Sequence, residues 1–102
     1  MIDSTLNEIV KRILKKVKAQ KIILFGSRVR GNYTEESDYD LLVICDDFID
    51  VKKLSKEIYS QFIGINKGVD VIIRPEKYIN ESKSNINSFI GNIINEGEVI
   101  YG

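Results

Sequence analysis

The segment from residue 25 to residue 44, FGSRVRGNYTEESDYDLLVI, contains a glycine-serine pair followed, after ten residues, by two aspartates one residue apart. Asp38 and Asp40 open a run of apolar residues that is typical of a buried β-strand. Because side chains alternate between the two faces of a strand, these carboxylates are expected to project together, while Tyr39 and Leu41 face the other way. The segment therefore predicts a pair of acids at the edge of the protein core.

A third acid interrupts a second apolar run further along the chain. Asp70 lies between two valines in GVDVII and is expected on a neighbouring strand. Adjacent strands are about 4.8 Å apart, so Asp38, Asp40 and Asp70 could approach within several ångströms at a buried edge of the sheet. A like-charge pair at about 4 Å costs on the order of 1 to 4 kcal/mol, and a bound cation removes that cost. The alternative is that each acid has a separate local role, in a turn, in a cap or in a pair with lysine.

The residue types near these acids indicate a hard metal ion. The chain has no histidine and its single cysteine, Cys45, is expected to be a reduced thiol in the core. Carboxylate oxygens without nitrogen or sulfur ligands select Mg²⁺, with Mn²⁺ as a substitute. The absence of histidine also excludes Ser-His and Cys-His nucleophile arrangements.

The glycine-serine pair predicts a phosphate-binding turn. Gly26 and Ser27 follow a short apolar strand and open a helical piece, where backbone N–H groups and the positive helix start can bind phosphate. Arg28 and Arg30 follow at once, and Arg30 could place its guanidinium over the same phosphates. Ser37 is interpreted as a turn or cap residue before the next strand.

The rest of the chain alternates between helical and extended patterns. We expect strands over 21–26, 38–45 and 69–73 and a final strand over 98–101. We expect a first helix with apolar residues from Leu6 to Val17 and a second helix over 51–62. A third helix, which stops at Gly97, is expected to carry Ile86, Phe89, Ile90, Ile93 and Ile94. These elements predict an α/β fold, with helices packed on a small mixed sheet. The 102 residues are expected to form a single domain, residues 1–102.

The composition of the chain limits the class of protein and its expected location. The chain is 43% hydrophobic and 29% charged, a globular balance, and it contains no apolar run of the length that a membrane span needs. Its amino terminus does not resemble a signal peptide, so we expect a cytoplasmic protein without a membrane partner. The net charge is zero, but residues 1–34 carry +6 and residues 35–102 carry −6. The net charge therefore does not indicate direct nucleic-acid binding. It does not exclude a local surface that binds a partner.

The positive charge is concentrated on the first predicted helix. Its basic residues largely avoid the apolar face, and they are Lys11, Arg12, Lys15, Lys16 and Lys18. We interpret this face as solvated, with a docking surface for an anionic partner as the alternative.

These motifs resemble the DNA polymerase β-like nucleotidyltransferase superfamily and, within it, the minimal nucleotidyltransferases. The family pattern is a glycine-serine turn, an Arg-Gly pair, Ser-Asp-x-Asp-Leu and a later strand acid. The matching residues here are Gly26, Ser27, Arg30, Gly31, Ser37, Asp38, Asp40, Leu41 and Asp70. The resemblance covers nearly the whole chain and implies a polymerase β-like fold.

The resemblance also implies a reaction. Asp38 and Asp40 would hold one Mg²⁺ bound to ATP, and all three aspartates would share a second Mg²⁺ that activates an attacking hydroxyl. Gly26 and Ser27 would cradle the phosphates that leave as pyrophosphate, and Arg30 would help to neutralise them. Minimal family members resemble antitoxins whose partner is a HEPN-type ribonuclease toxin, and the expected activity is transfer of AMP to a toxin tyrosine.

Two alternatives remain. One is a nucleotidyltransferase subunit for a small-molecule or RNA acceptor, with the pocket completed by a partner chain or by homo-oligomerisation. The other is a non-catalytic binding module that inhibits its partner by occlusion.

Overall fold

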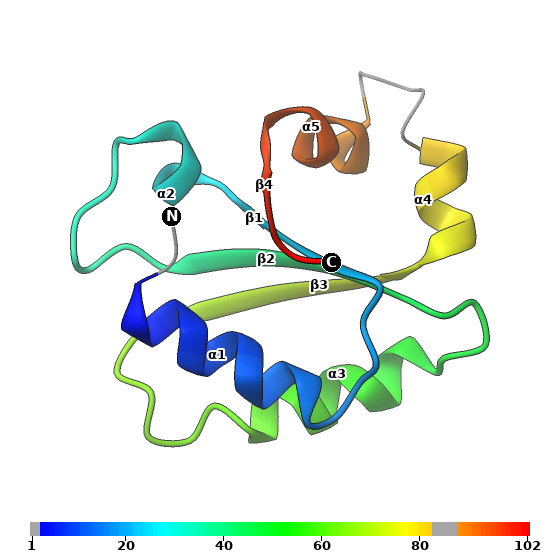
Figure 1. The fold of residues 1–102 in the computed structure, drawn as a ribbon, viewed down its shortest axis with the longest axis horizontal. Coiled ribbons are helices and arrows are strands. Elements are labelled where there is room, and N and C mark those ends of the chain that lie inside the picture. The colour runs from blue at the N-terminus through cyan, green and yellow to red at the C-terminus, as the bar shows by residue number, and fades with distance from the viewer. Residues whose placement is uncertain (1–2, 83–87) are drawn as a thin grey trace.

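The computed structural model describes residues 3–82 and 88–102, which form five helices and a four-stranded sheet. The elements in chain order are α1 (Ser4–Leu14), β1 (Lys21–Phe25), α2 (Ser27–Arg30), β2 (Tyr39–Cys45), α3 (Val51–Ser60), β3 (Val69–Pro75), α4 (Glu76–Ser82), α5 (Phe89–Glu96) and β4 (Glu98–Tyr101). The mixed α/β architecture predicted from the sequence is confirmed (Figure 1). Within the described residues, no helix has the length and apolar character needed to cross a membrane.

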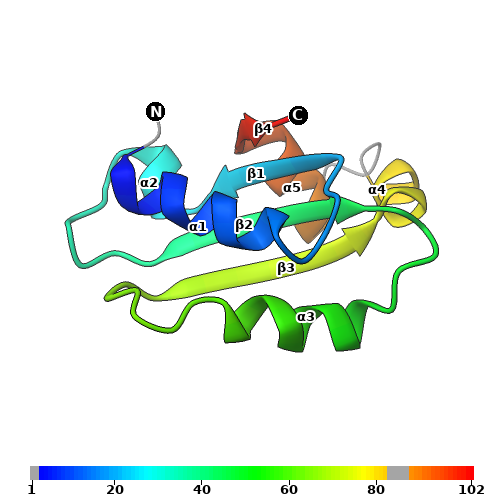
Figure 2. The same cartoon turned by 60° about the horizontal axis from the view of Figure 1, so that its bottom comes forward.

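The sheet has the strand order β3-β2-β1-β4 (Figure 2). The central strands β1 and β2 are antiparallel, with Phe25 opposite Asp40, and β2 runs parallel to β3, with Asp40 opposite Asp70. The short strand β4 pairs antiparallel with β1 through a shift in register between Ile22 and Ile23. The register therefore places two of the three predicted acids side by side on adjacent strands.

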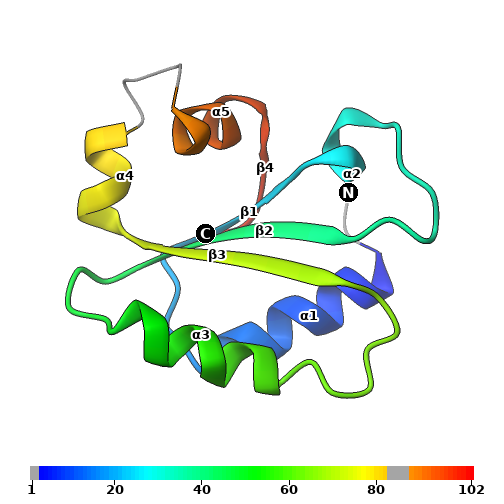
Figure 3. The ribbon, with the colours of Figure 1, turned by 180° about the vertical axis from the view of Figure 1, so that it is seen from behind.

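Helices cover both faces of this sheet, and each face has its own apolar cluster (Figure 3). On one face, α1 and α3 pack on alternate residues of the central strands, such as Leu41 and Val43. On the other face, Ile79 of α4 and Ile90 of α5 pack with Leu42. Alternation along β2 therefore puts Asp40 on the α4–α5 face, which it shares with Leu42.

Most predicted elements are confirmed, with shifts at their ends. The first helix stops at Leu14, and Val17 is buried in the segment that follows it. The helix α4 was not predicted, because its sequence, EKYINES, places few apolar residues at helical spacing. Ile86, assigned to the last helix, lies outside the described residues. Cys45 is a free, buried thiol, as expected.

Arg12 departs from the solvated helix face that was predicted for α1. Its Nε lies 2.9 Å from Glu8 Oε2, and its Nη1 donates to the carbonyl oxygens of Gln61 and Ile63 at 2.9 and 2.8 Å. Arg12 therefore ties the segment after α3 to α1. The remaining basic residues of this face are less enclosed, and Lys11, Lys15 and Lys18 are exposed, as the sequence predicts.

Candidate nucleotidyl-transfer site

Three chain segments meet at the end of the sheet where β1 ends and where β2 and β3 begin. The antiparallel pairing of β1 with β2 brings Gly26 beside Asp40, and the parallel pairing of β2 with β3 brings Asp70 to the same level. The backbone N–H of Tyr39 donates to Gly68 O at 2.9 Å, which fixes the start of β2 against the start of β3. Sequence positions more than forty residues apart thus converge at one sheet edge.

Asp40 is the centre of this arrangement. Its side chain is half-buried and lies against Gly26, where an added Cβ would overlap Asp40 Oδ2 and would lie 3.1 Å from Asp40 Cγ. Burial raises the pKa of Asp40, and so do the charges of Asp70 and Asp38 and a hydrogen bond with Asp70, while Arg30 opposes the shift. The charges of Asp38, Asp70 and Arg30 therefore all act on the carboxylate of Asp40.

Asp38 and Asp70 differ from the expectation of three acids at a buried edge, because both are exposed. Asp38 directly precedes β2 and its carboxylate lies against Gly68, where an added Cβ would be 2.7 Å from Asp38 Cγ. Gly68 was not predicted as a site residue. The feature of the sequence that could have indicated it is its position directly before the strand that carries Asp70. Its missing side chain leaves the space that Asp38 occupies.

The carboxylates fit a hard divalent cation by their chemistry. They provide oxygen ligands, and the effect of Asp70 and Asp38 on the pKa of Asp40 shows the charge repulsion that a cation would relieve. Within residues 3–82 and 88–102, however, no three acidic, histidine or cysteine side chains converge as a ready-made metal site. The structure thus brings Asp40 and Asp70 together and leaves Asp38 beside them, against Gly68.

A glycine turn lies at the end of β1, where the sequence predicts phosphate binding. Gly26 adopts φ 82° and ψ −155°, a conformation that is essentially restricted to glycine, and it turns the chain into α2. Its carbonyl oxygen accepts from the backbone N–H groups of Val29 and Arg30, both at 3.1 Å. Ser27 is half-buried at the first position of α2, and Arg30 is exposed at its last.

Arg28 has a different role from its neighbour Arg30. Its side chain is only 8% exposed, and its Nε and Nη2 donate to Ser37 O at 3.2 and 2.9 Å. The guanidinium carbon lies 3.9 Å from the centroid of the Tyr39 ring and 5.0 Å from that of Tyr33. Arg28 therefore fastens the segment before Asp38 to the phosphate-binding turn, a role that sequence spacing did not reveal.

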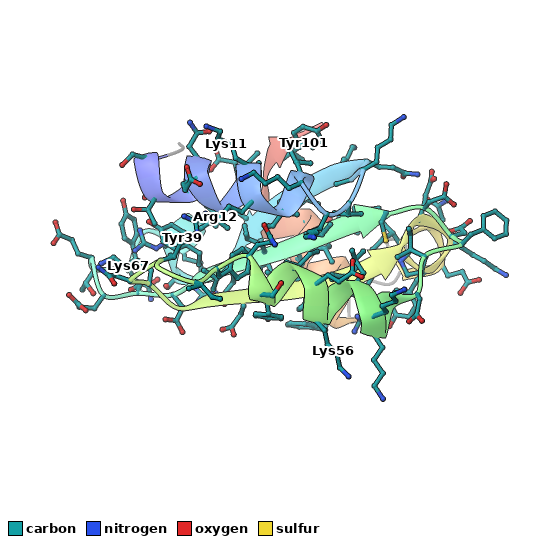
Figure 4. All side chains as sticks on the ribbon, turned by 90° about the horizontal axis from the view of Figure 1, so that it is seen from below. Lys11, Arg12, Tyr39, Lys56, Lys67 and Tyr101 are labelled. Atoms are coloured by element: carbon teal, nitrogen blue, oxygen red, sulfur yellow. The ribbon has the colours of Figure 1, made fainter. Side chains whose placement is uncertain are left out.

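Asp3 and Lys67 make further contacts at this end of the molecule, where Lys67 and Tyr39 line the same hollow (Figure 4). Asp3 caps α1 by accepting from the backbone N–H of Leu6 at 2.7 Å, and it also accepts from Tyr39 Oη at 2.7 Å. Lys67 Nζ donates to the carbonyl oxygen of Glu35. The chain on both sides of Asp38 is thus held by Asp3 before α1, by Arg28 of α2 and by Lys67 before β3.

Replacing Asp3 with asparagine should destabilise the protein at neutral pH. Burial alone would raise the pKa of Asp3, but hydrogen bonds from Leu6 and Tyr39 and the Arg28 charge outweigh it, and the pKa is lowered. The charge therefore stabilises the fold above the ordinary aspartate pKa of about 3.9, and this contribution is lost as the pH falls through the lower folded value. Since Asn caps helices as well as Asp, the loss should not exceed about 1 kcal/mol.

Urea unfolding of both proteins from about pH 7 to about pH 3 measures this difference. The gap in unfolding free energy should close toward the acid end. A gap that stays constant with pH would show that the Asp3 charge is not its cause.

Comparison with known proteins agrees with this geometry. The nucleotidyltransferase domain family matches residues 5–99 of the chain. A protein of Methanocaldococcus jannaschii, provisionally named a protein adenylyltransferase, is 36% identical over 103 residues, covering 97% of each chain. A second protein of that organism with the same provisional name is 35% identical over 99% of this chain and 75% of its own.

Solved structures show the same fold. A protein from Sulfolobus solfataricus, provisionally named a nucleotidyltransferase, superposes with a TM-score of 0.61 at 21% identity, covering 93% of this chain and 75% of its own. A chain from a toxin-antitoxin crystal structure with AMP-PNP superposes with a TM-score of 0.58 at 22% identity, over 94% of this chain and 72% of its own. The chain therefore belongs to the nucleotidyltransferase domain family, is a nucleotidyltransferase and has the polymerase β-like fold.

Proposed function

We propose that this protein transfers AMP from ATP to a tyrosine hydroxyl of a cognate HEPN-type ribonuclease toxin, and that it acts as the antitoxin of the pair. The observation that carries the proposal is the position of Asp40, which lies against Gly26 and pairs with Asp70 across β2 and β3. A nucleotide whose phosphates bind at Gly26 would have its reacting phosphorus beside these carboxylates.

In this proposal, Asp38, Asp40 and Asp70 hold Mg²⁺, with Mn²⁺ as a substitute. When bound, the two ions supply the positive charge that lowers the pKa of the acceptor hydroxyl and offsets the charge of the phosphates. Gly26 permits the close approach of the β- and γ-phosphates to the backbone, and Ser27 donates its hydroxyl. The exposed Arg30 guanidinium adds positive charge that acts on the carboxylate of Asp40.

The reaction is an in-line displacement at the α-phosphorus. The tyrosine oxygen forms a bond to that phosphorus, the bond to the oxygen bridging the α- and β-phosphates breaks, and pyrophosphate leaves. The phenolic proton passes to the carboxylate of Asp70, which is exposed on the edge strand β3 where an acceptor can reach it. The partner must hold the oxygen about 3 to 3.5 Å from the phosphorus.

The acceptor is assigned to a partner protein for two reasons. The described part of the chain forms a single sheet with its helices, and Asp38 and Asp70 at its edge are exposed rather than enclosed in a pocket. Relatives over nearly the whole chain carry the provisional name protein adenylyltransferase, and a structural neighbour was crystallised as a toxin-antitoxin. Both facts support a protein acceptor over a small molecule.

Incubation with ATP, Mg²⁺ and the co-encoded partner should add AMP to the partner, and its ribonuclease activity should fall as its mass rises. Intact-mass spectrometry measures the addition, and peptide mapping locates the modified tyrosine. The matched control is the Asp40→Asn protein, which keeps the shape of the side chain but loses its charge.

The outcomes distinguish the alternatives. A partner that is inhibited while its mass stays constant would show occlusion instead of transfer. Transfer to RNA or to a small molecule, without modification of the partner, would show that the protein is a nucleotidyltransferase with a different acceptor.

A further inference from the structure

Phe25 connects the phosphate-binding turn to an aromatic surface on the α4–α5 face. It is the last residue of β1, directly before Gly26, and it pairs with Asp40 across the sheet. Side chains opposite each other on paired antiparallel strands project from the same face, with Cβ atoms about 4.5 to 5.5 Å apart. The half-buried Phe25 ring therefore lies beside the carboxylate of Asp40 and packs with the apolar cluster of that face.

Phe89 extends this aromatic surface outward from the sheet. Its ring makes an edge-to-face contact with Phe25, with the centroids 6.1 Å apart and the planes at 84°. Phe89 is 62% exposed, although it is the first residue of α5, whose inner face is buried against the sheet. Ile90 and Ile93 of α5 are buried against the sheet, and the Ser88 hydroxyl accepts from the backbone N–H of Gly91 at 2.8 Å.

The position of Phe89 differs from that of two other exposed aromatic side chains, Phe48 and Tyr59. Phe48, which is 96% exposed, lies after the far end of β2, away from the acids. Tyr59 belongs to α3 and lies on the opposite face of the sheet. Phe89 is thus an exposed ring, held in place by a helix cap and by Phe25, on the face and at the strand end that carry Asp40.

We propose that the nucleobase of the donor nucleotide stacks on Phe89, with Phe25 as the support of that ring. This inference deepens the proposed function and rests on it. With the phosphates at Gly26 and the α-phosphorus beside Asp40, the nucleoside must extend away from the carboxylates. The α4–α5 face offers it an apolar surface. Purine bases stack on aromatic rings, and such stacking does not depend on the hydrogen-bonding edge of the base.

Phe89→Ala should weaken ATP binding about tenfold, as expected for loss of one base–aromatic stack, and should weaken GTP binding by a similar factor. It should leave the affinity for inorganic tripolyphosphate unchanged, because that ligand has no base. Phe89→Trp should restore ATP affinity, whereas Phe89→Leu, which is apolar but lacks a ring, should not. Isothermal titration in Mg²⁺, without a partner, measures all of these affinities.

Phe48→Ala is the matched control, since it removes another exposed phenylalanine from the other end of the strand, and it should bind ATP as the wild type does. Equal ATP affinity in the wild type and Phe89→Ala would overturn the inference while the proposed function stands. The inference would also be overturned if Phe89→Ala lowered only the affinity for the partner protein. If the wild type itself binds neither ATP nor tripolyphosphate, the donor site and the proposed function fail together.

Discussion

The Asp40→Asn protein should fold normally and lose AMP transfer, by about 10²- to 10³-fold or more in kcat, as when one group that stabilises developing charge is removed. Asp40 is the acid that touches both halves of the site, because it lies against Gly26 and interacts with Asp70. Its raised pKa means that folding disfavours the charged form, so a neutral isostere should keep or increase thermal stability. Loss of activity with stability retained is the expected signature.

Thermal unfolding and a transfer assay on the same samples measure both effects. Asp46→Asn is the control, since Asp46 follows the far end of β2 and its side chain accepts a local bond from the backbone N–H of Phe48 at 3.2 Å. That variant should transfer AMP at the wild-type rate. Asp38→Asn and Asp70→Asn should behave like Asp40→Asn, and transfer at the wild-type level by any of the three would remove that residue from the site.

Much of the geometry of this candidate site could be predicted from the sequence, because strand periodicity and motif spacing determine where its residues lie. Alternation along β2 fixes which side of the sheet Asp40 faces, and the positions of Gly26 and Asp70 at strand boundaries fix the end at which they meet. The glycine conformation at position 26 could also be expected, since the turn from strand to helix allows close phosphate approach only without a side chain.

The supporting contacts could not be predicted in the same way. Arg28 and Arg30 are two residues apart and chemically identical, yet one is buried against Tyr39 and the other is exposed. That difference depends on where residues 31–38 fold back over α2, which no local pattern encodes. The contact between Asp38 and Gly68 likewise exists only because β2 and β3 pair in one particular register.

The prediction of a buried edge is wrong for Asp38 and Asp70, for a physical reason. Apolar neighbours in the sequence predict that a strand is buried, but they do not tell where the covering helices end. At the start of β2 the chain is covered on the Tyr39 side, where that residue is 2% exposed, while Asp38 on the other side is open. The exposed edge is what an enzyme needs if its acceptor arrives on another macromolecule.

Gly26→Ala should remove nearly all transfer activity and also reduce stability. An alanine at this position would overlap Asp40 Oδ2, and its Cβ would fill the space between the turn and the acids. The backbone at φ 82° and ψ −155° is strongly unfavourable for any residue with a Cβ, at a cost of about 1 to 3 kcal/mol. Activity per folded molecule should therefore fall by at least about 10²-fold, because both the phosphate approach and the position of Asp40 change.

The Gly64→Ala variant is the control that introduces backbone strain without a contact to Asp40. Gly64 also has a positive φ, of 91°, but nothing lies within 4 Å of an added Cβ. This variant should lose about 1 kcal/mol or more of stability, because alanine is unfavourable at positive φ, and should keep its activity per folded molecule. Chemical unfolding gives the folded fraction, and the transfer rate is divided by it. If Gly64→Ala lost activity as Gly26→Ala does, backbone strain alone would explain the loss, and the contact between Gly26 and Asp40 would have no part in catalysis.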